Sequence, residues 1–108
     1  MRHKLSGAVW FLEHSHTYTF GATASNEDLL YVPEGVKVFS SERGGKYTYH
    51  GPGQRVCYVM LDLKALKMVD VRRYVHCLQK VVQESLLTFG IDSFIWDEHP
   101  GVWVIGND

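Results

Sequence analysis

A segment from Arg43 to Gln54, RGGKYTYHGPGQ, concentrates residue types that can bind a ligand. It contains four glycines and one proline together with cationic, hydroxyl and aromatic side chains. Gly44 and Gly45 lack Cβ atoms, so their backbone can approach a ligand and point amide donors at it, while Arg43 offers a fork of donors. The alternative is a tight connection between two strands, with glycine chosen for positive φ and the aromatics for packing.

Within this segment, Lys46 to His50 is predicted to be a short strand. Side chains alternate between the two faces of a strand. Thr48 and His50 should therefore share one face, and Tyr47 and Tyr49 the other.

Two nucleotide-binding loops are excluded by spacing. A phosphate loop needs Ser or Thr after Gly-Lys and a Gly five positions earlier, but Tyr47 follows Gly45-Lys46 and Ser40 occupies the earlier position. The run Gly51-Pro52-Gly53 has no third glycine at the spacing of a dinucleotide fingerprint and leads into a predicted strand.

The cysteines and histidines match no metal or redox spacing. Cys57 and Cys77 are expected to be free, packed thiols, as suits a reducing compartment. A His-x-His pair such as His14 and His16 can bind zinc when other ligands converge, but no convergence is visible, so no metal is expected. His76 lies opposite the apolar stripe of a predicted helix and should face water.

The elements that position these residues are strands and one helix. Strands are predicted from alternating or continuous apolar residues, and the segment 54–63 is expected to be buried on both faces. Apolar residues at intervals of three and four predict a helix over 71–89, with Asp70 as N-cap and Gly90 closing the C-terminus. The strands are expected over residues 7–13, 18–21, 36–40, 46–50, 54–63, 91–96 and 101–105, and residues 26–35 as a loop. The expected fold class is α/β (α+β), a mixed β-sheet with a covering helix.

Composition indicates one small globular unit of 108 residues with a net charge of -1. Scattered Lys and Arg residues argue against nucleic acid as a partner. The apolar run from Ala8 to Leu12 is too short for a signal peptide or a membrane span, so a cytoplasmic location is expected. The turn formers Gly106-Asn107-Asp108 either open a hairpin whose returning strand is missing or fray in solvent.

The segment RGGKYTYHGPGQ followed by RVCYVMLDLK resembles the signature of the lipoyl(octanoyl) transferases. FLEHSHTYTFGATAS, DVRRYVHCLQKVVQESLLTFGI and PGVWV also resemble segments of that family. Lipoate ligases are the nearest rival, but they carry an Arg followed by three glycines and a His-Asp pair. Here two glycines lead to His50-Gly51-Pro52-Gly53, which favours the transferase.

The resemblance implies a function and a set of site residues. Family members move an octanoyl group from its carrier protein onto a cysteine and then to a lysine of a lipoyl domain. The implied partners are octanoyl-acyl carrier protein and the lipoyl domains of 2-oxoacid dehydrogenase complexes and of the glycine cleavage H protein; no cofactor is implied. The implied substrate-binding residues are Arg43, Gly44, Gly45, Lys46, Tyr47, Thr48, Tyr49, His50 and, from the early Glu-His turn, His14.

The resemblance places the catalytic lysine and cysteine of the family beyond Asp108. Residues 1–108 are therefore expected to be a partial biotin/lipoate ligase-like catalytic domain that lacks the catalytic half and is inactive alone. Two alternatives remain, a noncatalytic acyl-binding remnant and a lipoate-protein ligase, and the ligase would depend on ATP.

Overall fold

The computed structural model describes residues 7–106, which divide into two compact units at Leu61 and Asp62. Each unit is described by itself. No helix in residues 7–106 is both long enough and apolar enough to cross a membrane.

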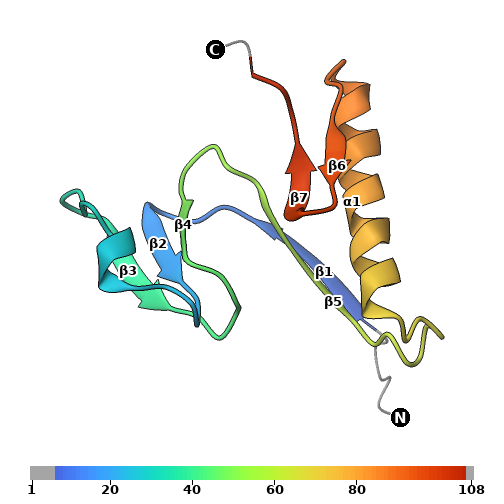
Figure 1. Ribbon diagram of the computed structural model, residues 1–108, viewed down its shortest axis with the longest axis horizontal. Coiled ribbons are helices and arrows are strands. Elements are labelled where there is room, and N and C mark those ends of the chain that lie inside the picture. Colours follow the sequence, from blue (N-terminus) through green and yellow to red (C-terminus); the bar gives the residue numbers. More distant parts are fainter. Residues whose placement is uncertain (1–6, 107–108) are drawn as a thin grey trace. The chain divides into compact units, whose positions relative to one another are not determined.

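The first unit contains a long antiparallel ribbon of two strands (Figure 1). Strand β1 (Gly7–Leu12) pairs with β5 (Val56–Leu61), with Gly7 opposite Leu61 and Leu12 opposite Val56. The prediction that this part of the chain is buried on both faces is wrong, because only Val56 and Val59 of β5 are even half-buried. Within the first unit the ribbon consists of β1 and β5 alone, and two strands by themselves enclose little apolar surface.

The other sheet of the first unit is mixed and has the order β3-β2-β4. The central strand β2 (Thr17–Phe20) runs parallel to β3 (Lys37–Ser40) and antiparallel to β4 (Tyr47–His50). A short 3₁₀ helix, η1 (Asn26–Asp28), lies in the segment predicted to be a loop. This sheet carries the segment singled out for ligand binding.

The second unit consists of helix α1 (Val71–Thr88) and a hairpin of β6 (Phe94–Trp96) and β7 (His99–Trp103). The helix packs beside the hairpin (Figure 1). Gln79 Nε2 donates to the Gly101 carbonyl at 3.2 Å, and Gln83 Nε2 donates to the Ser93 carbonyl at 3.3 Å. These bonds fasten one side of the helix to the hairpin.

Both predicted ends of the helix are confirmed. The Asp70 carboxylate accepts from the backbone N–H groups of Arg72 and Arg73 at 3.0 and 3.3 Å, which satisfies two amides of the first turn. Gly90 has a φ angle of 73°, the left-handed conformation that closes a helix. The α/β fold class is also confirmed, although the described strands form three small sheets and not one.

Residues 7–106 contain no fully buried hydrophobic side chain. The two thiols are free, as predicted, but the expectation that they are packed is wrong, since Cys57 and Cys77 are both exposed. Cys57 belongs to strand β5 of the ribbon and Cys77 to helix α1. An apolar stripe is buried only where another sheet or helix packs on it. The small sheets described here cover little of such a surface.

Candidate functional site

The predicted division of β4 into two faces is confirmed by its pairing with β2. Thr48 lies opposite Thr19 and His50 opposite Thr17, whereas Tyr47 lies opposite Phe20. The rings of Tyr47 and Phe20 are 5.3 Å apart between centroids. One face of the sheet is therefore aromatic, and the other carries threonines and His50.

Arg43 fastens its loop to the polar face of the sheet. Its Nη2 donates to the carbonyl and hydroxyl oxygens of Thr19 at 3.0 and 2.9 Å and to the Thr48 hydroxyl at 3.2 Å, while Nη1 donates to the Gly44 carbonyl at 2.8 Å. The fork expected to serve a ligand thus binds oxygens of the chain itself. Thr19 was not foreseen as part of the site, because only the strand pairing brings it to Arg43.

Gly45 has a φ angle of 89°, a conformation that residues with a side chain rarely adopt. A Cβ atom at this position would lie 3.3 Å from Arg43 Nη1, whereas a Cβ atom on Gly44 would meet nothing within 4 Å. The backbone conformation at position 45 therefore explains why Gly45 is a glycine. At Gly44 there is open space where a side chain would lie.

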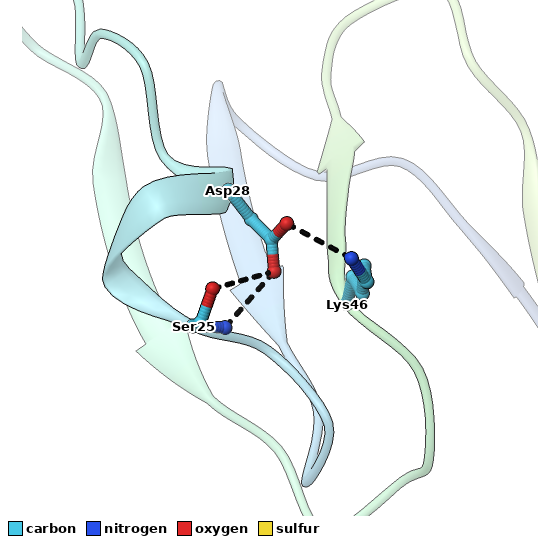
Figure 2. A network of polar contacts seen from close by, with 3 residues as sticks. All are labelled: Ser25, Asp28 and Lys46. Atoms are coloured by element: carbon cyan, nitrogen blue, oxygen red, sulfur yellow. Dashed lines mark hydrogen bonds and ion pairs between the residues drawn. The ribbon is translucent and has the colours of Figure 1, made fainter.

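Lys46 ties the end of the loop to η1 (Figure 2). Its Nζ lies 3.0 Å from Asp28 Oδ1, and Asp28 Oδ2 accepts from the backbone N–H and the hydroxyl of Ser25 at 2.9 and 3.3 Å. The Ser25 N–H and then the Lys46 ammonium hold the pKa of the Asp28 carboxyl below its ordinary value of 3.8. The carboxylate thus caps η1 and holds Lys46 at the same time.

The lowered pKa of Asp28 predicts how the stability of this part of the fold changes at acidic pH. A carboxyl group whose pKa is depressed by folding contributes stability that is present above its unfolded pKa and is lost as the pH falls through the lower, folded pKa. Lys46→Ala should raise the pKa of Asp28 toward 3.8, and carboxyl ¹³C NMR during an acid titration measures it. Lys80→Ala removes a charge from α1 that forms no ion pair with Asp28 and should leave the titration unchanged. An identical Asp28 titration in both variants would contradict the ion pair.

The polar face of the sheet opens into a cavity of ≈ 400 Å³ that brings together residues from both sheets of the first unit. His14 and His50, which are 36 positions apart in the sequence, have ring centroids 5.5 Å apart. His14 Nε2 is hydrogen-bonded to Tyr58 Oη at 3.0 Å, and His50 Nδ1 to Gln54 Oε1 at 3.3 Å. The cavity is lined by His14, Ser15, Thr17, Thr19, Lys37, Phe39, His50 and Tyr58.

The sequence indicated only His14 and His50 among the lining residues. The six that it missed are Ser15, Thr17, Thr19, Lys37, Phe39 and Tyr58. The pairing of β2 with β3 places Lys37 opposite Thr17 and Phe39 opposite Thr19, on the same face as His50. Alternation of side chains along each strand indicates this face once the strand pairing is known. The sequence does not indicate the pairing itself, because parallel strands are not joined by a short turn whose residues could be recognised. Tyr58 lies next to Cys57 on β5, so their side chains leave the ribbon on opposite faces.

Tyr47 and Tyr49, two of the predicted substrate-binding residues, do not line the cavity. The rings of Tyr49 and Tyr18 have centroids 5.8 Å apart, and His16 Nδ1 is hydrogen-bonded to Tyr49 Oη at 2.6 Å. Tyr47 and Tyr49 therefore support the sheet from its aromatic face, while His14, His50 and Thr19 line the cavity on the other face.

The remaining histidines form no such group. Within residues 7–106, no three side chains of the His, Cys, Asp or Glu types are placed to hold a metal ion, and His3 lies outside the described residues. His76 is exposed, as predicted, and lines a separate hollow in the second unit with Trp96 and His99. The cavity of the first unit therefore offers hydrogen-bonding and cationic groups beside aromatic carbon, and the thiols of Cys57 and Cys77 do not line it.

The chain is similar to curated octanoyltransferases. It is 46% identical over 99 residues to that of Zymomonas mobilis, 50% over 96 residues to that of Anaplasma phagocytophilum and 49% over 100 residues to that of Brucella melitensis. These matches cover 92%, 89% and 93% of this chain but only 45%, 46% and 37% of the relatives. The chain thus spans less than half the length of these proteins.

The same similarity extends to a family model, described as the lipoyl protein ligase A/B catalytic domain, which matches residues 2–107. That match includes both units and every residue of the cavity and its loop. The chain therefore belongs to the lipoyl protein ligase A/B catalytic domain family.

Proposed function

We propose that this chain supplies the substrate-binding part of an octanoyltransferase, and that residues 1–108 are part of a biotin/lipoate ligase-like catalytic domain. The observation that carries the proposal is the convergence of His14 and His50 on one cavity, beside the loop that Arg43 holds in place. The names of the relatives support the activity.

The reaction would proceed in two acyl transfers. A cysteine thiolate, expected beyond residue 108, attacks the octanoyl thioester of the carrier protein, forms a new carbon–sulfur bond and releases the carrier thiol. A lysine amine of a lipoyl domain then attacks the acyl-cysteine, forms the amide and returns the cysteine thiol.

In this scheme the residues of the chain bind and orient the acyl group. We assign the backbone amides of Gly44 and Gly45 the role of donors to the acyl carbonyl, whose oxygen gains negative charge during each attack. Phe39 and Tyr58 provide carbon surface along the cavity for the alkyl chain, and His14 and His50 border it. The proposed partners are octanoyl-acyl carrier protein and lipoyl domains, and the proposed location is the cytoplasm.

A chimera tests the proposal directly. The 99 matched residues of the Zymomonas mobilis octanoyltransferase are replaced by the corresponding residues of this chain, and octanoyl transfer to a lipoyl domain is followed by mass spectrometry. We expect the chimera to form product and the 108-residue chain alone to form none above a blank without enzyme. Product from the chain alone would show that the catalytic groups lie within it.

The family description also includes ligases, so ATP dependence is the second measurement. The two glycines after Arg43 favour the transferase over a ligase, as do the names of the relatives. The chimera should use octanoyl-acyl carrier protein without ATP. A chimera that uses free octanoate only with ATP would indicate a ligase, and one that binds octanoyl groups without transferring them would indicate an acyl-binding module.

A further inference from the structure

Gly21, at the end of β2, is buried against the loop that follows β3. Its N–H donates to the Lys46 carbonyl at 3.2 Å, and the N–H of Ala22 donates to the Arg43 carbonyl at 3.1 Å. The backbone of the loop is therefore fastened to the backbone of residues 21 and 22 at both of its ends.

The space that a side chain would need at Gly21 is filled by the loop. A Cβ atom there would lie 2.6 Å from the carbonyl oxygen of Arg43 and 2.5 Å from those of Gly44 and Gly45. All three are backbone atoms, so the contact cannot be relieved by turning a side chain. Even one methyl group at position 21 requires the loop to move.

The inward carbonyls determine where the amides of the loop point. The described chain contains no cis peptide bond, and in a trans peptide the N–H group points opposite to the carbonyl. With the carbonyls of Arg43, Gly44 and Gly45 around Gly21, the N–H groups of Gly44, Gly45 and Lys46 face away from Gly21. Residues 44–46 are exposed, and the two glycines have no side chain that could cover these donors.

We propose that Gly21 is a positioning residue for acyl transfer: its missing side chain lets the carbonyls of residues 43–45 turn inward, which presents the following amides to the acyl carbonyl. This inference rests on the proposed function. Gly21 itself touches no substrate, and it acts through the loop.

The test compares Gly21→Ala with Gly7→Ala in the chimera. Gly7 is a matched control because a Cβ atom there would also crowd backbone, lying 2.7 Å from the Met60 carbonyl oxygen, but in the β1–β5 ribbon. Displacing a reacting group by about 1 Å can cost about 100-fold in rate. We expect Gly21→Ala to slow formation of the acyl-enzyme by about 100-fold, and Gly7→Ala to stay close to the unmutated rate per folded molecule.

Amide NMR spectra of the 108-residue chain distinguish a local movement of the loop from a general loss of stability. In Gly21→Ala the signals of residues 43–46 should shift while those of β1 and β5 stay in place. Unshifted loop signals, equal acylation rates in the two variants, or loss of the β1 and β5 signals as well would each overturn the role of Gly21. A chimera inactive before mutation would instead overturn the proposed function, and the loop signals would still test the position of the loop.

Discussion

Replacing His50 by alanine in the chimera should slow formation of the acyl-enzyme by about 100-fold, the loss that a misplacement of the reacting group by about 1 Å can cause. His50 lines the cavity, and its ring lies beside that of His14 on the polar face of the sheet. Its Nδ1 is hydrogen-bonded to Gln54 Oε1 at 3.3 Å. Alanine would remove that ring, which widens the cavity beside His14.

His76→Ala is the matched control, since it removes the same side chain from an exposed position on α1. It should leave the rate unchanged. The amount of octanoyl-cysteine formed in the first seconds, measured by mass spectrometry of the intact enzyme, reports on the first half-reaction alone. If His50→Ala forms the acyl-enzyme as fast as His76→Ala, the cavity is not the acyl site.

The other large effect is expected from Gly45→Val. The φ angle of 89° at this position strains any residue with a Cβ atom, at a cost of about 1–3 kcal/mol, and a β-branched side chain is the least tolerated. Its Cβ atom would also press on Arg43 Nη1, the nitrogen that donates to the Gly44 carbonyl. We expect acylation to fall by at least about 100-fold because the loop and its guanidinium anchor move together.

Gly106→Val is the control for the added bulk, because a Cβ atom on Gly106 would meet nothing within 4 Å. Acyl-enzyme formation and transfer to the lipoyl domain are measured separately for both variants. A Gly45→Val enzyme that acylates normally would mean that this glycine serves only the turn. The assignment of residues 43–50 as the substrate loop would then be wrong.

Local features of the fold were predictable from sequence because local chemistry determines them. The ends of α1 follow from a carboxylate at position 70 and a glycine at position 90, and both act within one turn. Strand ends were less accurate. The last strand was predicted over 101–105 and observed as His99–Trp103, because hairpin pairing with β6, and not side-chain type, determines its start.

Burial could not be predicted from the same pattern. The apolar run in β5 indicates a strand but not what covers it, and within residues 7–106 β5 pairs with β1 alone. Cys57 illustrates the point, since a thiol among apolar residues is exposed here.

In the candidate site, too, features set by neighbouring residues were predictable, and those set by strand pairing were not. The sequence indicated the loop, the alternation of Thr48 with Tyr49, and the convergence of His14 with His50 through family resemblance. It did not indicate Gly21, Thr19 or Tyr58, each of which meets the site through a partner more than twenty positions away. Such contacts depend on which strands pair, and no short pattern encodes that choice.

The nesting of the two sheets in the first unit has a consequence for the order of folding. β1 and β5 enclose β2, β3 and β4 between them in the sequence, so the ribbon can close only around a long intervening segment. The pairs Thr17–Lys37 and Leu12–Val56 bring together residues 20 and 44 positions apart. Closing the longer segment costs more chain entropy, by about 0.6 kcal/mol per doubling of length. Assembly of the inner sheet shortens the segment that the ribbon must close, so the loop-bearing sheet should form first and β1–β5 last.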